Sequence, residues 1–236
     1  MADEPGALPQ LALPPWLRAW AARPPEPRRD AGRVLVLAFG LVRSAAMLDA
    51  TMASLERRAP PGAELAVCAY ADAPVFGAAH ARLNRTRLRL RSVALFDVRT
   101  RASELSCGGN ARRAGEHRNE RAAAELLLHV RPREWGGRPI VVLWRIDTEL
   151  ISDIDVPSAQ SADLIAVPHL QSGGRLNDRF LVGDTRAVQR LVAARAALLD
   201  SECIYGEAAL VRLVRDLKLR VTFTRTRVVR RRADLF

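Results

Sequence analysis

Residues 140–147 read IVVLWRID: a run of apolar residues is followed at once by an arginine, an isoleucine and an aspartate. A short continuous apolar run is typical of a strand that is buried on both faces of a parallel sheet. Such sheets bind ligands beyond the carboxyl ends of their strands. The sequence therefore predicts a buried strand over Ile140 to Trp144 and a polar ligand site where this strand reaches Arg145 and Asp147.

Similar patterns extend in both directions from this strand. The residues from 83 to 96 alternate arginine with apolar side chains, which predicts an edge or antiparallel strand with one face in water. Strands alternating with helices predict an α/β fold with a mostly parallel central sheet flanked by helices. We expect strands over 34–39, 64–70, 83–96, 140–144, 163–167 and 219–229, and helices over 44–58, 116–130, 185–199 and 202–217.

The composition is that of a single domain with its own core. The chain has 236 residues, of which 49% are hydrophobic, and this is enough for a sizeable core. Residues 1–30 hold seven of the fourteen prolines and show no regular apolar period. We therefore expect a Pro-rich N-terminal arm over 1–30 and one Rossmann-like domain over 31–236.

The cysteines and the N-terminus bear on the compartment. Cys68, Cys107 and Cys203 are widely spaced and form no C-x-x-C pair, so neither a disulfide framework nor a zinc knuckle is indicated. Asp3 and Glu4 stand where a signal peptide would carry positive charge. No apolar run approaches the roughly 20 residues that a membrane-spanning helix needs. We expect a cytoplasmic protein without a transmembrane segment.

The formal net charge of +11 permits a nucleic-acid-binding alternative, because clustered cations gain affinity for polyanions by releasing counterions. Only 5% of the residues are aromatic and none interleaves the basic strand, so few side chains could stack on bases. Solvated surface charge is the simpler interpretation. The arginines that could serve this alternative are Arg87, Arg89, Arg91, Arg225, Arg227, Arg230, Arg231 and Arg232.

A first candidate site lies directly after the opening strand. A turn from Gly40 to Arg43, ahead of a helix that Ser44 can cap, can bring backbone N–H groups and a guanidinium to a phosphate. It matches neither a dinucleotide fingerprint nor a P-loop. The alternative is a helix-entry turn with a surface arginine.

Carboxylates past the strand 140–144 form a second candidate. Asp147 directly follows the strand and can hold a hard divalent cation. Asp153 and Asp155 form a D-x-D farther on, where Ser152 and Asp153 can serve as helix caps instead. We favour Asp147 over this pair.

Two further polar groups remain ambiguous. The segment from His169 to Gly183 includes Asn177, Asp178 and Arg179, and we expect an adaptable polar loop between a strand and a helix. The same residue types are also ordinary turn chemistry, and a lone histidine is more often structural than a ligand. Ser201 and Glu202 stand at the start of an expected helix, where capping is at least as good an explanation as catalysis.

In their order and spacing these pieces resemble GT-A-type nucleotide-sugar glycosyltransferases, in particular a loosely characterised group found in algae, plants and large DNA viruses. The resemblance covers about residues 33–232. It rests on a G-x-x-R turn, an R-x-D strand end, an N-D-R-F-like segment followed by a glycine, and a Ser-Glu pair. In this chain they correspond to Gly40 and Arg43, to Arg145 and Asp147, to Asn177, Asp178, Arg179, Phe180 and Gly183, and to Ser201 and Glu202.

The resemblance implies a GT-A-like fold and the transfer of a sugar from a nucleotide diphosphate sugar to a hydroxyl of a glycan or another acceptor. Mn²⁺ or Mg²⁺ would be held at Asp147, with His169 as a second candidate ligand. Asp178 or Glu202 would orient the acceptor or take its proton. The donor would be bound by Gly40, Arg43, Arg145, Asp147, Asn177 and Arg179.

One departure from the family pattern and one alternative function keep other interpretations open. No D-x-D stands at the end of the strand 140–144 itself. Arg145 can therefore take the place of a metal and neutralise part of the diphosphate charge. A transferase fold that has lost turnover and kept a structural role is the alternative to an active enzyme.

Overall fold

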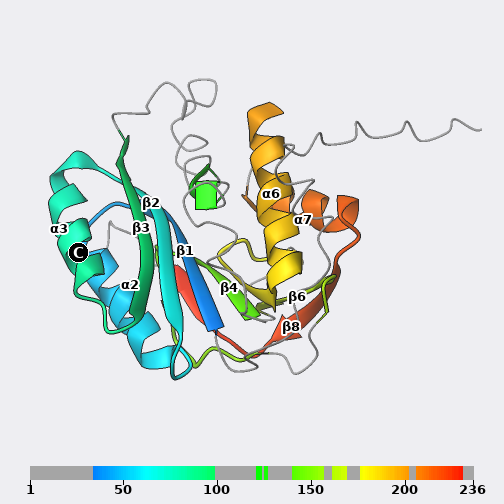
Figure 1. Ribbon diagram of the computed structural model, residues 1–236, viewed down its shortest axis with the longest axis horizontal. Coiled ribbons are helices and arrows are strands. Elements are labelled where there is room, and N and C mark those ends of the chain that lie inside the picture. Colours follow the sequence, from blue (N-terminus) through cyan, green and yellow to red (C-terminus); the bar gives the residue numbers. More distant parts are fainter. Residues whose placement is uncertain are drawn as a thin grey trace, which may run out of the picture.

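The computed structural model of the chain describes residues 34–98, 121–123, 125–126, 140–156, 161–168, 176–201 and 206–230 (Figure 1). The strands are β1 (Val34–Val42), β2 (Glu64–Ala71), β3 (Arg89–Asp97), β4 (Ile140–Arg145), β5 (Thr148–Leu150), β6 (Leu164–Pro168), β7 (Phe180–Asp184), β8 (Arg220–Thr224) and β9 (Val228–Arg230). The helices are α2 (Ala45–Arg58), α3 (Ala73–Asn84), α6 (Thr185–Ser201) and α7 (Gly206–Asp216), and residues 121–123 and 125–126 are also helical. Among the helices that the structure describes, none has both the length and the apolar composition needed to cross a membrane.

Seven strands form one mixed sheet in the order β3-β2-β1-β4-β7-β6-β8, and β5 pairs with β9 in a small second sheet. Strands β3, β2, β1 and β4 run parallel to one another, while β7 is antiparallel to both β4 and β6. The expected α/β fold with a mostly parallel sheet flanked by helices is therefore confirmed. A GT-A-like identity of this sheet remains a proposal.

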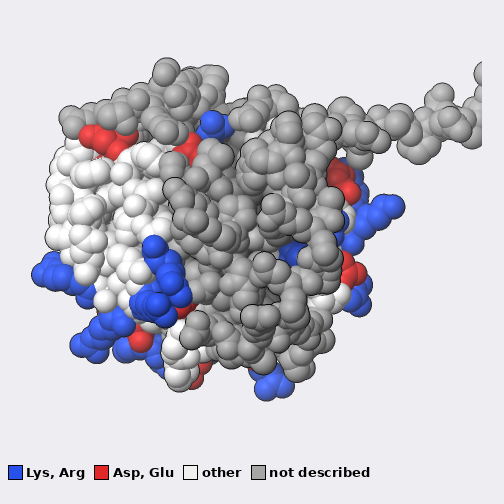
Figure 2. Space-filling view, in the orientation of Figure 1, with Lys and Arg blue, Asp and Glu red and all other residues white. Residues whose placement is uncertain are grey.

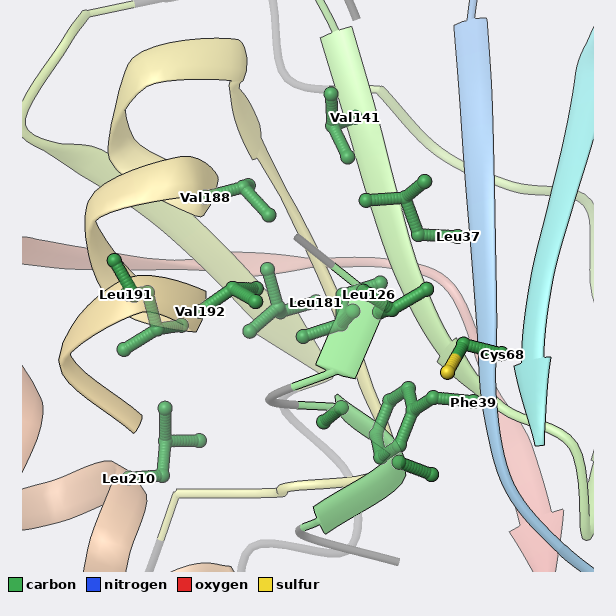
Figure 3. Packing of buried hydrophobic residues seen from close by; sticks show 14 of the residues in the cluster. Leu37, Phe39, Cys68, Leu126, Val141, Leu181, Val188, Leu191, Val192 and Leu210 are labelled. Carbon is green, nitrogen blue, oxygen red and sulfur yellow. The ribbon is translucent and has the colours of Figure 1, made fainter. Parts of the chain in front are cut away.

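Alternate residues of the central strands enter two cores, one on each face of the sheet. Leu37 and Phe39 of β1 join Leu191 and Val192 of α6 in the first core (Figure 3). In the second core, the other face of β1 packs against α2 and α3. Figure 1 shows the two helix pairs on opposite sides of the sheet. Because both faces are covered, β1, β2 and β4 are buried throughout, as the unbroken apolar runs predict.

The chain changes direction across the sheet between β1 and β4. From β1 it proceeds outward through β2 to β3, and it then returns to place β4 on the other side of β1. The carboxyl ends of β1 and β4 lie side by side: Phe39 pairs with Arg145, and the Ile146 N–H donates to the Phe39 carbonyl at 2.8 Å. A doubly wound sheet leaves a ligand-binding crevice at such a topological switch point.

A helix occupies residues 73–84, where the sequence analysis expected none, and the strand predicted from Leu83 begins only at Arg89. Asp72 is the N-cap residue and Pro74 lies in the first turn, a position that proline tolerates well. This helix is the crossover that lets β3 run parallel to β2. The alternation in β3 correctly predicted an edge strand, and the antiparallel option was wrong.

The end of the predicted polar loop over 169–183 is instead β7, a buried strand. Phe180, Leu181 and Val182 are too apolar for a wet loop and pair with β4. Gly183 lies in this strand, where a Cβ would stand 3.1 Å from Val188 Cγ2 and 3.2 Å from the Leu164 carbonyl. A glycine at position 183 therefore allows close packing, and Gly183 belongs to a strand rather than to a loop.

The closing strand predicted over 219–229 is divided into β8 and β9. Between them, the Arg225 N–H donates to Asp155 Oδ2 at 2.8 Å, and the Asp155 N–H donates to the Thr226 hydroxyl at 2.8 Å. With these bonds the chain leaves the main sheet after β8 and continues into β9, which pairs with β5. Strand β5 over Thr148–Leu150 was not predicted either. The remaining described strands and helices were predicted, with bounds that differ by a few residues.

Candidate functional site

Polar side chains from four segments gather around the topological switch point. They come from the start of α2, the end of β4, the residues just before β7 and the end of β9. Hydrogen bonds, ion pairs and mutual electrostatic effects connect them. We call the set the switch-point site, and it comprises Arg43, Arg145, Asp147, Asn177, Asp178, Arg179 and Arg230.

Arg145 is the centre of this site and is only 5% exposed. Its Nε and Nη2 donate to the two oxygens of Asp147 at 2.6 and 3.3 Å. Its Nη1 donates to Asp178 Oδ2 at 2.9 Å. A planar guanidinium fork suits this bidentate arrangement, and both carboxylates are as buried as the arginine. The site therefore contains a buried, fully formed ion-pair triad.

Backbone hydrogen bonds place the segments that carry the triad. The Arg145 N–H donates to the Arg179 carbonyl at 2.7 Å, which sets the residues before β7 against the end of β4. Trp144 Nε1 donates to the Thr148 carbonyl at 2.9 Å and closes the tight reversal that contains Asp147. Buried tryptophan N–H groups need such a partner. The apolar strand end thus also shapes the polar turn.

Arg230 reaches the site through the small sheet. Residue 230 in β9 is the register partner of Thr148 in β5, which is the residue after Asp147. Its Nε lies 3.3 Å from Asp147 Oδ2, and the side chain is 35% exposed. The Nε atom is nevertheless buried and makes no hydrogen bond. Arg230 is therefore held by charge, without the directed hydrogen bonds that fix Arg145.

The local charges shift the pKa values of the site. Burial alone would raise the pKa of Asp147, but the charge and hydrogen bonds of Arg145 outweigh it, and the pKa is held below its ordinary value. Arg230 and Arg179 add to this lowering. Burial lowers the pKa of Arg230 and the charge of Asp147 opposes it, while the charges of Arg145, Arg179 and Arg43 lower it further. The guanidinium groups are thus close enough to repel one another.

The polar atoms left unsatisfied in this site are N–H donors. Asn177 is 2% exposed; its Oδ1 accepts from the Arg179 N–H at 2.8 Å, so the remaining amide atom is the donor Nδ2, which has no partner. Arg179 Nε is also buried without a partner. Buried unpaired donors cost free energy, and an oxygen-rich anion can satisfy them.

The donor set can be tested against the divalent cation that the resemblance implies. Both oxygens of Asp147 already accept N–H groups from Arg145, and Arg230 adds positive charge beside them. Among the described residues no group of three or more His, Cys, Asp or Glu side chains is arranged to hold a metal. Hard cations need several free oxygen ligands. The described part of the site does not fit such an ion and suits an anion.

The first predicted turn, over Gly40 to Arg43, is mostly strand in the structure. Gly40, Leu41 and Val42 belong to β1 and pair with β2, because the two apolar residues are buried. Gly40 has φ 126°, a conformation that favours glycine. The turn reduces to Arg43 and Ser44; Arg43 is exposed, and the Ser44 hydroxyl accepts the Met47 N–H at 3.1 Å as predicted. Arg43 remains available to a ligand.

The D-x-D pair has structural partners. Asp153 pairs with Arg58, the last residue of α2, at 3.0 Å and is 79% exposed. Asp155 binds the segment between β8 and β9 through the Arg225 N–H and the Thr224 hydroxyl. Neither carboxylate belongs to the switch-point site, and neither caps a helix.

Two predicted site residues, His169 and Glu202, lie outside the described residues. Ser201 is the last residue of α6, and α7 begins at Gly206, so the prediction that Ser201 caps the next helix is wrong. Alanine-rich sequence continues α6 with no break before residue 201. The structure does bring together two groups that are about 30 residues apart in the sequence, namely Arg145 with Asp147, and Asn177 with Asp178 and Arg179.

Arg230 was missed as a site residue, because the sequence places it in an arginine-rich tail. A weak signal was present in the sequence: Val228 and Val229 precede Arg230 within the arginine-rich tail. Two apolar residues followed by arginine resemble, on a small scale, the end of β4. Only the pairing of β9 with β5 connects Arg230 with Asp147.

The basic strand of the nucleic-acid alternative carries partnered charges. Glu64 pairs with both Arg89 and Arg91; Glu56 accepts the Arg87 N–H and pairs with Arg82 of helix α3 at 3.0 Å. Figure 2 shows Lys and Arg side chains over the β2–β3 end of the molecule with acidic side chains among them. Charged residues on an edge strand also discourage pairing with other chains. These arginines have a structural explanation.

The geometry is thus that of an arginine-rich polar cluster at the switch point of an α/β sheet. No protein-family model matches this chain, and no curated protein sequence matches it either.

Proposed function

We propose that the protein is a glycosyltransferase, hexosyltransferase-like, that moves a sugar from a nucleotide diphosphate sugar to an acceptor hydroxyl. The observation that carries the proposal is the buried triad of Arg145, Asp147 and Asp178, surrounded by further arginines at the switch point. This crevice is where α/β sheets bind nucleotides. The resemblance of the R-x-D strand end and the N-D-R-F-like segment to GT-A-type enzymes supplies the reaction class.

The arginines suit a diphosphate leaving group. Guanidinium groups bind phosphate oxygens bidentately and remain charged at every physiological pH. Preorganised positive charge in a water-poor site stabilises the negative charge that develops as the sugar departs. Arg145 is fixed by its two carboxylates, whereas the partly exposed Arg179 and the exposed Arg43 are open to the ligand. Arg43 and Arg179 would bind the phosphates directly, and Arg145 would contribute fixed positive charge nearby.

Asp178 is the candidate group for the acceptor or the sugar. Its Oδ2 accepts from Arg145, and within the described part of the chain no hydrogen bond engages Oδ1. A general base must reach the reacting hydroxyl within hydrogen-bond distance, and an ion-paired carboxylate is a weak base. Asp178 is therefore proposed to orient a hydroxyl through Oδ1. Glu202 stays the alternative for taking the proton.

Calorimetric titration with UDP and GDP tests the donor site. The intact protein should bind at least one of them, and Arg43→Gln should weaken that binding by about tenfold, the cost of one charged hydrogen bond. Arg57→Gln, at an exposed arginine in the last turn of α2, is the matched control and should bind like the intact protein. If the intact protein binds neither nucleotide, the proposed donor site is wrong.

Binding without chemistry would favour the degenerate transferase. Radiolabelled UDP-sugars and GDP-sugars, offered with simple glycan acceptors, should yield transferred or hydrolysed sugar with the intact protein. Asp178→Asn keeps the side-chain size and should lower that turnover while nucleotide binding persists. Nucleotide binding with no release from any donor would leave a binding protein in place of an enzyme.

A further inference from the structure

The switch-point site contains more positive than negative side chains. Its described members include four arginines, Arg43, Arg145, Arg179 and Arg230, whose mutual repulsion contributes to the lowered pKa of Arg230. The carboxylates that oppose them are Asp147 and Asp178, and both are bound by Arg145. Two positive charges therefore remain without a carboxylate of their own. A ligand with about two negative charges would balance the site.

The groups that lack a hydrogen-bond partner have the same chemistry. Asn177 Nδ2, Arg179 Nε and Arg230 Nε are buried and unsatisfied, and all three are donors. A metal ion would satisfy none of them, because cations bind to acceptors. Phosphate oxygens accept hydrogen bonds, and they carry the negative charge that would balance the arginines.

Arg230 is the arginine best placed to respond to a ligand. Arg145 cannot turn toward a phosphate without giving up its hydrogen bonds to two buried carboxylates, which is costly. Arg230 lies beside Asp147 at 3.3 Å but makes no hydrogen bond through Nε, and about a third of its side chain is exposed. Turning toward an anion would cost it little. Its backbone meanwhile stays anchored by the pairing of β9 with β5.

We propose that Arg230 neutralises the donor diphosphate in the role that a divalent cation would otherwise fill, so that the site binds its diphosphate without metal. This inference rests on the proposed function, since it names how the same donor is held. Asp147 then acts as the anchor for Arg145 and Arg230 rather than as a metal ligand. The absence of a D-x-D at the end of β4 follows from the same arrangement.

The test measures UDP and GDP binding to the full chain by calorimetry, once with excess EDTA and once with Mn²⁺. The intact protein should bind equally in both buffers, within about twofold. Arg230→Gln should weaken nucleoside diphosphate binding about tenfold or more in EDTA, as loss of a charged phosphate contact does. Arg227→Gln changes an exposed arginine of the same segment, for which the structure shows backbone hydrogen bonds, and should bind like the intact protein.

Two further measurements make the result decisive. Uridine and guanosine, which lack phosphate, should bind the intact protein and Arg230→Gln equally, which assigns the loss to the diphosphate. Far-UV circular dichroism and thermal unfolding of each variant report whether β9 still folds; if Arg230→Gln unfolds, Arg230→Lys should bind with intermediate affinity. Binding that requires Mn²⁺ and is insensitive to Arg230→Gln would overturn this inference and leave the donor site intact. Binding of neither nucleotide in either buffer would overturn both.

Discussion

The arginines near the β2–β3 edge, namely Arg82, Arg89 and Arg91, have the same side chain as those of the switch-point site but differ in their carboxylate partners. Near this edge, Arg82 of α3 contacts both Asp49 and Glu56 of α2, and Arg89 and Arg91 of β3 share Glu64 of β2. At the switch point, a single arginine makes hydrogen bonds to both carboxylates, Arg230 shares one of them as an ion pair, and the four arginines outnumber the two carboxylates. The difference teaches that arginine content says little about function until the partner of each guanidinium is known.

The largest expected effect comes from breaking the buried triad. Asp147→Ala should lower the free energy of unfolding by about 3–5 kcal/mol, because it leaves Arg145 buried with one carboxylate fewer. Urea denaturation monitored by circular dichroism measures the change. Asp153→Ala, which removes an exposed ion pair, is the control and should cost under about 1 kcal/mol. Equal losses in the two variants would erase the contrast between buried and exposed pairs.

A smaller effect is expected at the edge. Glu56→Gln should cost roughly 1–2 kcal/mol, because the Glu56 carboxylate accepts from Arg82, from the Thr86 hydroxyl and from the Arg87 N–H. Asp49→Asn, at the exposed second partner of Arg82, should change stability by less than about 0.5 kcal/mol. Urea denaturation at neutral pH ranks the two variants.

The contribution of the Glu56 carboxylate to the free energy of unfolding should also depend on pH. Burial raises the pKa of Glu56, but the hydrogen bonds from Arg82, Thr86 and Arg87 outweigh it and hold the pKa below its ordinary value of 4.5. The folded state thus favours the charged form, so the advantage over Glu56→Gln is full well above pH 4.5 and is lost as the pH falls through the folded-state pKa. Unfolding curves at several pH values measure this gap. A gap that widens toward acid would contradict the assignment.

The smallest effect should follow from the basic strand. Replacing Arg87, Arg89 and Arg91 together by glutamine should leave UDP and GDP affinity unchanged within about twofold, since these side chains lie on β3 or just before it, away from the switch point. A gel-shift series with single-stranded RNA at rising salt tests the nucleic-acid alternative on the same variant. Tight, steeply salt-dependent binding that the replacement abolishes would move function to the edge.

Much of the framework could be predicted because its signals are local. Unbroken apolar runs identified β1, β2 and β4, and the Ser44 cap and the prolines after Arg58 delimited α2. Local signals failed where the pairing of strands determines the secondary structure. Phe180 to Asp184 forms a strand because β4 and β6 offer it hydrogen bonds, and residues 73–84 form a helix because β3 must return parallel to β2.

The sequence by itself determined that an α/β sheet would present Arg145 and Asp147 at the end of a buried strand, since burial and strand period are read from neighbouring residues. Only the tertiary structure decided their partners. The switch point sets Asp178 against Arg145, and the β5–β9 pair carries Arg230 to Asp147, from a segment that had looked like a basic tail. Charge balance depends on distances between segments remote in sequence, and these arise only when the sheet is assembled.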